Sequence, residues 1–372
     1  MKKIGIIRGL MPRLTQAEFA ASFSHLDPVF ITGESGKEIA SYCKENGVVQ
    51  RDLSLIPLFL RDPFQLVLRR RVHQSWIGVS GLAAACRDVD VLETYELYHL
   101  FSGQAATVSK KLQIPLVCEV WTSFAKHPAY LLPPYRWNVQ KVIKQTSLFI
   151  ARSEKAASAL RQLSVPEEKI RMIYHGVNID RFRPSKKNPT MPVRILFVGE
   201  LTAYKGVSMI LAVWPKVREK FPDAELVLVG KGPLFDQAKK TSGVSAVGYV
   251  SHTKLSAVYA SCDIFVSPSQ DRYLGPLLWW EEFFSYTLME ALAAGLPIIA
   301  TRSGGIPEEI GEENWLIPQR DPQALLQALL DACSDSVRRG KLREKNRHRA
   351  ETHFDLKKQT AILEKEIQKL RI

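Results

Sequence analysis

Cysteine is scarce in this sequence, and no CxxC pair occurs, so neither a zinc site nor a disulfide framework is indicated. Five scattered thiols favour a reducing cytosol. No apolar run approaches the ~20 residues that a membrane-spanning helix needs. The apolar run at the N-terminus is short and is broken by Arg8, which predicts a first β-strand rather than a signal peptide. The cysteines are Cys43, Cys86, Cys118, Cys262 and Cys333.

The composition is that of an ordinary globular protein. Hydrophobic residues make up 46% of the 372 residues and charged residues 24%, which excludes a disordered, collagenous or coiled-coil chain. At ~100–200 residues per domain, the length predicts two or three domains.

Acidic residues are outnumbered, and the formal net charge is +13. Residues 1–184 contain 25 basic and 16 acidic side chains, a net of +9, and the remainder contains 26 and 22, a net of +4. An excess of positive charge favours binding to an anionic partner, whether nucleic acid, an anionic membrane or a phosphorylated substrate. No recognised nucleic-acid-binding module is present, so we expect no nucleic-acid partner.

Short apolar runs alternate with helical patterns through both halves, which is typical of parallel sheets covered by helices on both faces. A polar, proline-flanked stretch at 184–189 reads as a linker. We therefore predict two doubly wound α/β domains, 1–184 and 185–354, and expect the amphipathic run 355–372 to pack back on the first. The predicted strands are 3–7, 28–32, 90–93, 115–120, 147–151, 170–174, 194–198, 225–229, 263–267 and 297–300.

The stretch before one predicted helix combines two carboxylates with a helix start. Ser285 is a good N-cap and Gly295 a good stop, which places Glu282 before the helix and Glu290 inside it. The backbone N–H groups from Phe284 onward would form an anion site. Carboxylates that accept hydrogen bonds from hydroxyls, beside amides that hold phosphates, suit a phosphate ester of a polyol. Two unrelated glutamates on a solvated helix are the alternative.

The surrounding motifs resemble the family-4 glycosyltransferases of the GT-B fold. They occur in the family's order and extend over nearly all of 170–318, whereas the first half matches only loosely. The matching segments are IYHGVNIDRFRP (173–184), FVGELTAYKGV (197–207), ELVLVGKGPL (225–234), SCDIFVSPS (261–269), the E-x7-E pair Glu282–Glu290, ALAAGLPIIA (291–300) and GGIPE (304–308).

The resemblance implies two Rossmann-like domains that face each other across a cleft. It implies retaining transfer of a hexose from a UDP- or GDP-linked sugar to a hydroxyl of a glycan or lipid-linked acceptor, in cell-envelope polysaccharide or glycolipid synthesis. The nucleotide-sugar is a substrate, and no cofactor or metal is expected. A nucleotide-sugar epimerase of the same architecture is the alternative. A Rossmann oxidoreductase is disfavoured because no GxGxxG follows the first strand.

The resemblance also implies roles for individual residues. Glu290 would bind the ribose hydroxyls of the nucleotide, and Glu282 would bind hydroxyls of the donor sugar. Lys205 would neutralise the donor diphosphate, a role that suits a compact ammonium. Gly304 and Gly305 would permit a tight turn beside the donor, although plain turn chemistry would also explain them.

Other positions near the donor follow from the same comparison. Tyr249 and Val250 would lie close to the base. Many family members have an arginine five residues before the lysine, where this sequence has Glu200. A carboxylate beside a diphosphate is repulsive, so we expect Glu200 to turn away and another cation to substitute.

A long loop, 270–281, precedes Glu282. Arg272 in this loop is the candidate for the substituting cation, with a solvated loop arginine as the alternative. Trp279 and Trp280 could stack on a sugar ring or fill the core.

Three residues of the first domain are candidates for acceptor or sugar contacts. Gly9 is the one glycine in the loop after the first strand, where the family often has a glycine-rich loop. Trp121 stands where a histidine is common, and His127 follows six residues on. His127 would reach the sugar or serve a structural role.

The segment 58–79 combines apolar and aromatic side chains with the cluster Arg69, Arg70 and Arg71. This composition predicts an interfacial helix on an anionic bilayer, or an ordinary amphipathic core helix with solvated arginines. We expect a cytoplasmic protein, which on the first interpretation is peripheral on the inner face of the membrane.

Overall fold

The chain forms two compact units in the computed structural model, which describes residues 1–10, 12–56, 78–185 and 193–370. Unit 1 consists of Met1–His175 with Leu356–Ile372, and unit 2 of Gly176–Asp355. The predicted boundary after residue 184 therefore lies inside unit 2. The predicted linker lies mostly outside the described residues, as does the predicted interfacial helix except for its last two residues.

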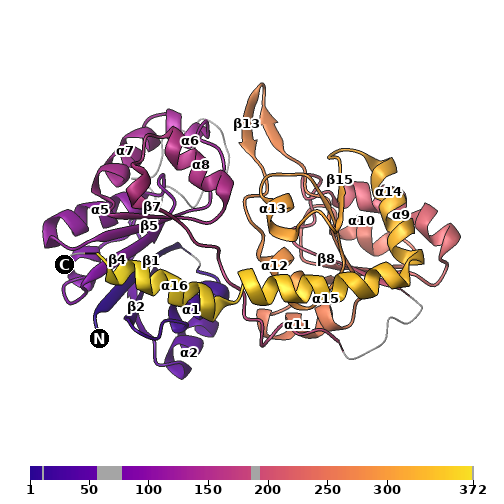
Figure 1. Ribbon diagram of the computed structural model, residues 1–372, viewed down its shortest axis with the longest axis horizontal. Coiled ribbons are helices and arrows are strands. Elements are labelled where there is room, and N and C mark those ends of the chain that lie inside the picture. The colour runs from indigo at the N-terminus through magenta and orange to yellow at the C-terminus, as the bar shows by residue number, and fades with distance from the viewer. Residues whose placement is uncertain (11, 57–77, 186–192, 371–372) are drawn as a thin grey trace. The chain divides into compact units, whose positions relative to one another are not determined.

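Unit 1 is built on a seven-stranded parallel sheet in the order β3-β2-β1-β4-β5-β6-β7 (Figure 1). The order reverses its direction between β1 and β4, which is the switch point of a doubly wound sheet. The strands are β1 (Lys3–Leu10), β2 (Asp27–Gly33), β3 (Val49–Leu53), β4 (Val91–Tyr95), β5 (Leu116–Val120), β6 (Leu148–Ala151) and β7 (Ile170–Met172).

Helices cover both faces of this sheet, and successive strand residues enter different cores. Leu116 and Cys118 pack in one core, whereas Val117 packs in the other together with helix α16. Burial on both faces explains why the strands read as continuous apolar runs. The helices are α1 (Leu14–Ala21), α2 (Lys37–Glu45), α4 (Leu82–Ala85), α5 (Leu100–Leu112), α6 (Pro128–Leu131), α7 (Tyr135–Gln145), α8 (Glu154–Gln162), the 3₁₀ turn η3 (Glu167–Lys169) and α16 (Leu356–Gln368).

A buried carboxylate attaches the C-terminal helix α16 to unit 1. Oε1 of Glu364 accepts hydrogen bonds from the backbone N–H groups of Ser24, His25 and Leu26, at 2.9, 2.6 and 2.8 Å. Leu363 is fully buried in the same core. One carboxylate oxygen thus accepts from three consecutive loop amides, so α16 completes the first unit.

Unit 2 has a six-stranded parallel sheet in the order β10-β9-β8-β11-β14-β15. A separate antiparallel hairpin, β12 (Arg272–Leu274) with β13 (Leu277–Trp280), forms where a long loop is predicted (Figure 1). The other strands are β8 (Arg194–Val198), β9 (Glu225–Val229), β10 (Val244–Gly248), β11 (Ile264–Ser267), β14 (Ile298–Thr301) and β15 (Trp315–Ile317).

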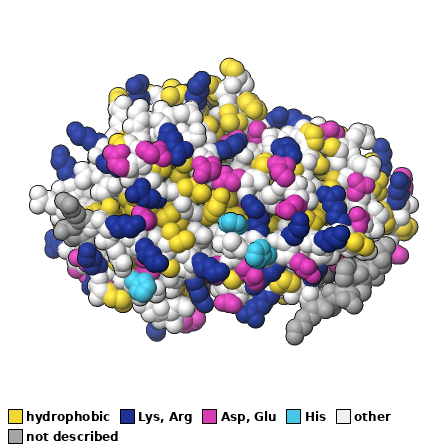
Figure 2. All heavy atoms as spheres, viewed as in Figure 1, with side chains coloured by type: hydrophobic (Ala, Val, Ile, Leu, Met, Phe, Trp, Pro, Cys, Tyr) yellow, Lys and Arg dark blue, Asp and Glu magenta, His cyan; other side chains and the backbone are white. Residues whose placement is uncertain are grey.

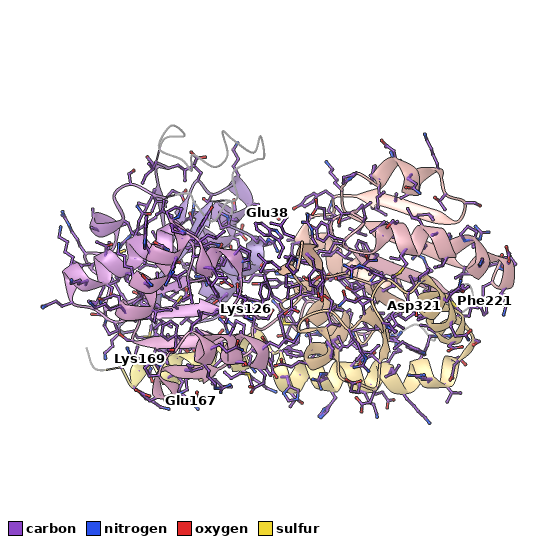
Figure 3. The ribbon with its side chains drawn as sticks, turned by 90° about the horizontal axis from the view of Figure 1, so that it is seen from above. Glu38, Lys126, Glu167, Lys169, Phe221 and Asp321 are labelled. Carbon is purple, nitrogen blue, oxygen red and sulfur yellow. The ribbon has the colours of Figure 1, made fainter. Side chains whose placement is uncertain are left out.

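Two consecutive helices of unit 2, α14 and α15, begin with an aspartate whose side chain caps the helix. Asp321, labelled in Figure 3, accepts hydrogen bonds from the N–H groups of Gln323 and Ala324 at the start of α14. The long helix α15 follows directly. The helices are α9 (Val207–Lys220), α10 (Phe235–Lys240), α11 (His252–Ala260), α12 (Tyr286–Ala293), α13 (Ile306–Ile310), α14 (Pro322–Ser334) and α15 (Ser336–His353).

Charged side chains of both signs are distributed over the face drawn in Figure 2. In the face drawn in Figure 2, Lys and Arg side chains occur over the whole visible area, with Asp and Glu side chains among them. Among the residues that the structure describes, no helix combines the length and apolar character needed to cross a bilayer.

Candidate functional site

Loops that follow the parallel strands of unit 2 bring together polar side chains from distant parts of the sequence. Lys205 lies between β8 and α9, Ser269 follows β11, and Glu282 precedes α12. In open α/β sheets ligands bind beyond the carboxyl ends of the strands, and these residues lie there.

Glu282 is the centre of this group. Its Oε2 accepts hydrogen bonds from Lys205 Nζ at 2.7 Å and from Ser269 Oγ at 2.8 Å. The Glu282 backbone N–H donates to Ser303 Oγ at 3.2 Å. The structure therefore brings the predicted diphosphate cation and the predicted sugar-binding carboxylate into direct contact. Ser269 and Ser303, which the sequence reasoning missed, hold that carboxylate and its backbone in place.

The glycine after Lys205 has a clear structural reason. Gly206 has a φ of 79°, and a Cβ at this position would lie 2.1 Å from the carbonyl oxygen of Pro268. No side chain fits there, so the loop can pass close to the end of β11 only with glycine. This close approach brings Lys205 next to Ser269 and Glu282.

Gly304 and Gly305 pack against the backbone that carries Glu282. A Cβ at Gly304, whose φ is 51°, would lie 1.9 Å from the Glu282 carbonyl oxygen, and one at Gly305 would lie 2.1 Å from that of Phe283. The Gly305 N–H donates to the Glu282 carbonyl at 2.8 Å. The two glycines thus determine where Glu282 sits, whatever contact they make with a ligand.

Helix α12 begins at Tyr286 with Ser285 at the N-cap position, as predicted. The Ser285 backbone N–H already donates to Oε2 of Glu309 at 2.9 Å. Burial raises the pKa of Glu309 well above its ordinary value. One of the predicted anion-binding amides therefore holds a carboxyl group. The Phe284 ring is buried against Phe354, with ring centroids 5.7 Å apart, so its side chain belongs to the core.

Glu290 lies in α12 and is only 2% exposed. Its Oε2 accepts a hydrogen bond from the Tyr259 hydroxyl at 2.8 Å, and its Oε1 lies 3.0 Å from His252 Nε2. Arg181 NH1 lies 2.8 Å from His252 Nδ1. A guanidinium can only donate, so Nδ1 accepts and Nε2 carries the proton that faces Glu290. The His252 tautomer is therefore assigned by its two partners.

His252, Arg181 and Tyr259 were not predicted as site residues. Tyr249 and Val250, predicted to lie near the base, belong to the same loop between β10 and α11 that leads to His252 at the first position of the helix. Tyr249 is 71% exposed and Val250 is half-buried. His252 could have been predicted from its position, because it begins a helix directly after the loop predicted to bind the base.

Glu200 is engaged by a tyrosine. The Tyr204 hydroxyl donates to Glu200 Oε2 at 2.7 Å, and burial together with Glu200 raises the pKa of Tyr204 to about 12. Arg272, the candidate replacement cation, lies with its guanidinium carbon 4.8 Å from the centroid of the Tyr204 ring. Lys205 Nζ lies 4.5 Å from the centroid of the Trp280 ring. Two cations thus pack on aromatic rings at one end of the hairpin.

The three candidates of unit 1 have structural contacts. A Cβ at Gly9 would lie 2.6 Å from the Phe101 ring, so this position has room only for glycine. The Trp121 backbone N–H donates to Glu96 at 2.9 Å. His127 caps helix α6, because its Nδ1 accepts the Ala129 N–H at 3.2 Å. This contact is a structural one, and a sugar contact of His127 stays a prediction.

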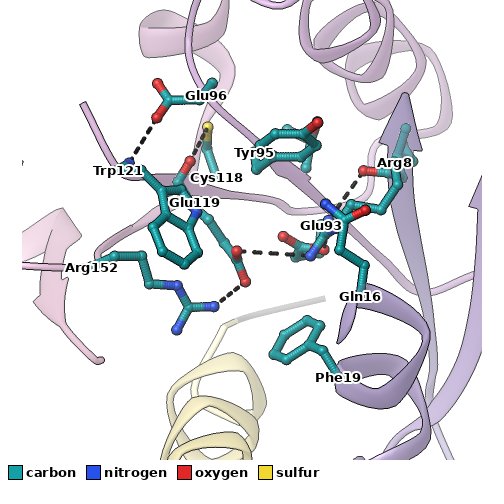
Figure 4. Close-up of polar contacts among 12 residues, drawn as sticks. Arg8, Gln16, Phe19, Glu93, Tyr95, Glu96, Cys118, Glu119, Trp121 and Arg152 are labelled. Carbon is teal, nitrogen blue, oxygen red and sulfur yellow. Dashed lines mark hydrogen bonds and ion pairs between the residues drawn. The ribbon is translucent and has the colours of Figure 1, made fainter. Parts of the chain in front are cut away.

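A buried ionic network, which sequence reasoning missed, lies at the carboxyl edge of the unit 1 sheet (Figure 4). Arg8 NH1 lies 2.5 Å from Glu93 Oε2, and Arg8 NH2 lies 3.7 Å from Glu119 Oε2. Arg152 pairs with the other oxygen of Glu119. All four side chains are at most 3% exposed. Arg8 and Arg152 thus pair with the two carboxyl groups, although the buried Glu93 Oε1 and Arg152 Nε have no hydrogen-bond partner among the described residues.

Within the described ranges, no three His, Cys, Asp or Glu side chains are close enough together to hold a metal ion. The positive charge near Glu282 is supplied by Lys205, with Arg272 on the adjacent aromatic ring.

Comparisons with known proteins agree with this picture. The family description "Glycosyltransferase Family 4" matches residues 30–181, and "Glycosyl transferases group 1" matches residues 192–335. WcaL of Escherichia coli (strain K12) is 29% identical over 209 residues, which cover 54% of this chain and 50% of WcaL. The amylovoran biosynthesis glycosyltransferase AmsK of Erwinia amylovora is 28% identical over 250 residues, 63% of this chain and 60% of AmsK.

Solved structures share the fold over the whole chain. Anabaena HepE, crystallised in complex with UDP-glucose, has a TM-score of 0.77 at 16% identity, with 100% of both chains covered. A glycosyltransferase from Rickettsia africae has a TM-score of 0.71 at 17% identity, covering 100% of this chain and 99% of its own. The chain spans about half the length of the first curated relatives that it matches. The two family regions together extend over most of the sequence, and both units have the Rossmann-like sheet, so the chain belongs to the family-4, group 1 glycosyltransferases of the GT-B fold.

Proposed function

We propose that this protein is a retaining hexosyltransferase that moves a sugar from a UDP- or GDP-linked donor to a hydroxyl of a cell-envelope glycan or lipid-linked acceptor. The observation that carries the proposal is the contact of Lys205 with Glu282. Glu282 lies just before helix α12, and the buried Glu290 lies within that helix. A cation beside a carboxylate suits a ligand that is anionic at its diphosphate and rich in hydroxyls at its sugar.

The proposed roles follow from the chemistry of each group. Lys205 stabilises the negative charge that grows on the diphosphate as the bond to the anomeric carbon breaks. Glu282 accepts hydrogen bonds from sugar hydroxyls and so orients the ring. Glu290 accepts hydrogen bonds from the ribose, with His252 and Tyr259 holding its carboxylate. The acceptor hydroxyl attacks the anomeric carbon from the face of the leaving group as the bond to the diphosphate oxygen breaks, which retains the anomeric configuration. The hydroxyl proton passes to the departing diphosphate, and we name no protein nucleophile.

Relatives support the class of donor and acceptor. HepE was crystallised with UDP, with UDP and glucose, and with UDP-glucose. The relative from Mycolicibacterium smegmatis, 25% identical over 241 residues, is named as a GDP-mannose-dependent phosphatidylinositol monomannoside mannosyltransferase. These names support a nucleotide-sugar donor and leave both UDP and GDP in the proposal.

A thermal-shift screen with UDP, GDP, ADP and their sugars tests the donor. A ligand at ~100 times its dissociation constant stabilises a protein by ~2.7 kcal/mol, which is easily detected. We expect one base to stabilise strongly, and its sugar nucleotide to stabilise differently from the bare nucleotide. An NMR spectrum of the product then tests retention. No shift with any nucleotide would contradict the donor site.

The epimerase alternative is not favoured, because the relatives reported above are named as transferases. Incubation with the sugar nucleotide alone separates the two activities. An epimerase converts the free donor without acceptor, whereas the proposed transferase leaves the sugar configuration unchanged.

A further inference from the structure

The β12–β13 hairpin of unit 2 is a separate two-stranded sheet. Its strands pair in the register Arg272↔Trp280, Tyr273↔Leu278 and Leu274↔Leu277, and neither strand joins the six-stranded sheet. Gly275, with a φ of 59°, makes the turn together with Pro276. A lone hairpin of this kind is marginally stable in water, so its side chains gain from a second surface.

The distal half of the hairpin exposes large apolar side chains. Leu274 is 64% exposed, Tyr273 54%, Leu277 44% and Trp279 42%. Figure 2 shows hydrophobic side chains gathered at the projecting tip where Figure 1 draws β13. Contiguous exposed apolar side chains on a projecting element mark a surface that contacts something other than water.

The side chains are ordered along the hairpin. Leu274 and Leu277 flank the turn, Tyr273 and Trp279 follow, and Arg272 lies at the end nearest the rest of unit 2. Arg320, from the loop before α14, lies with its guanidinium carbon 5.9 Å from the Tyr273 ring centroid. The side chains thus change from aliphatic to aromatic to cationic along the hairpin. Membrane-bound proteins show the same order from the acyl chains of the bilayer, through its interface, to the lipid phosphates.

The charged residues around the hairpin favour an anionic bilayer over a glycan as its binding partner. Both arginines pack on aromatic rings: Arg272 on Tyr204 at the base of the hairpin, and Arg320 on Tyr273, one residue from Leu274. Acidic residues lie at the base of the hairpin and not at its tip: Asp271 accepts a hydrogen bond from Ser303 Oγ at 2.5 Å, and Glu200 accepts one from the Tyr204 hydroxyl at 2.7 Å. A glycan would use the aromatic rings but would leave the two leucines of the tip in water.

We propose that the Leu274–Leu277 tip inserts into the interface of an anionic bilayer, with Tyr273 and Trp279 at the headgroup level and Arg272 and Arg320 toward the lipid phosphates. Each cation near an anionic surface contributes to binding, and the apolar tip adds burial that salt does not screen. This surface is distinct from the segment 58–79. The proposal concerns membrane binding and does not depend on the proposed transfer activity.

The first experiment measures co-sedimentation with phosphatidylglycerol-containing vesicles at low and at physiological salt. The double variant Leu274→Ser with Leu277→Ser removes the tip and leaves Trp280 beside Lys205 unchanged. The matched control, Val337→Ser, removes an aliphatic side chain that is 67% exposed on α15. We expect the tip variant to bind roughly tenfold more weakly and the control to bind as the parent. Equal binding of all three proteins overturns the proposal.

The second experiment reports insertion directly. All five cysteines are buried, so Leu274→Cys can be labelled with an environment-sensitive dye, with Lys240→Cys on α10 as the control position. On addition of anionic vesicles, we expect a blue shift and quenching by lipid-borne quenchers at position 274 only. Vesicle binding without a change at 274, or a lipid-independent change that rises with protein concentration, overturns the proposal in favour of another surface or of self-association.

Discussion

Lys205 Nζ lies 2.7 Å from Glu282 Oε2, so the two groups assigned to the donor's diphosphate and sugar form an ion pair with each other. Their side chains are 23% and 11% exposed, and partial shielding from water strengthens the attraction. On the proposed function, the bound donor replaces this ion pair with two contacts. Its diphosphate accepts hydrogen bonds from the Lys205 ammonium, and its sugar hydroxyls donate to the Glu282 carboxylate. The pair therefore holds both side chains in position before the donor arrives.

Replacing Lys205 with methionine is expected to lower turnover by ~10²–10³-fold, the usual cost of losing one charge-stabilising contact in a transition state. The loss should appear mainly in kcat, because the diphosphate charge is greatest as it leaves. Initial rates over a range of donor concentrations measure it. Lys254→Met, on the exposed side of α11, is the control. Unchanged turnover in Lys205→Met would remove the lysine from the donor site.

Glu290→Ala is expected to weaken binding of the nucleotide and also to lower stability. The substitution removes the acceptor of the His252 N–H, which costs ~1–3 kcal/mol for a buried group, whereas the Tyr259 hydroxyl keeps the Thr287 carbonyl as an acceptor at 3.2 Å. Glu290→Gln keeps an acceptor oxygen and should retain more stability than the alanine variant. Calorimetric titration with nucleotide and thermal unfolding separate the two effects. Full affinity in a folded Glu290→Ala protein would place the ribose elsewhere.

Glu282→Gln tests the sugar contact. The amide keeps the size of the side chain but loses its charge, and with it the ion pair to Lys205. We expect rate and choice of sugar to change more than affinity for the bare nucleotide, which lacks the hexose. Parallel titrations with nucleotide and nucleotide-sugar decide the matter. Equal losses for both ligands would mean that Glu282 acts on the nucleotide rather than on the sugar.

Much of the secondary structure of unit 2 could be predicted, because residues adjacent in sequence determine where its helices begin and end. The helix Tyr286–Ala293 was predicted from local signals: Ser285 occupies the N-cap position, although its side chain makes no capping hydrogen bond, and Gly295, with a φ of 68°, follows the last turn. Lys205 and Glu282 could be placed only by resemblance, because their contact joins residues far apart in sequence.

Elements stabilised by tertiary contacts escaped the sequence reasoning. Helix α15 is almost entirely polar, and it is held by contacts such as the Asn346 side-chain amide on the Leu296 carbonyl at 2.7 Å. The network of Arg8, Glu93 and Glu119 was missed because charged residues inside strands resemble interruptions until their partners on neighbouring strands are known. The hairpin was missed because two three- to four-residue strands have too little periodicity to detect.

Activity is expected to survive EDTA, because the proposed mechanism stabilises the leaving diphosphate with Lys205 and assigns no step to a metal. Transfer is measured with and without chelator at a fixed donor concentration. Complete loss of activity, restored by magnesium or manganese, would contradict this prediction and would assign part of the charge stabilisation to a divalent cation.

Stability should fall as the pH rises through the titration of Glu93. Burial and the neighbouring Glu119 raise the pKa of Glu93 from 4.5 to about 8, although Arg8 opposes the shift. The folded protein then holds this proton more tightly than the unfolded chain, so the folded state loses relative stability between pH 4.5 and about 8. Glu93→Gln stays neutral, so its thermal midpoint should decline less over this range than that of the parent. Glu313→Gln, at an exposed ion pair with Lys345, is the control. Parallel pH profiles for Glu93→Gln and the parent would mean that Glu93 is already ionised in the folded network.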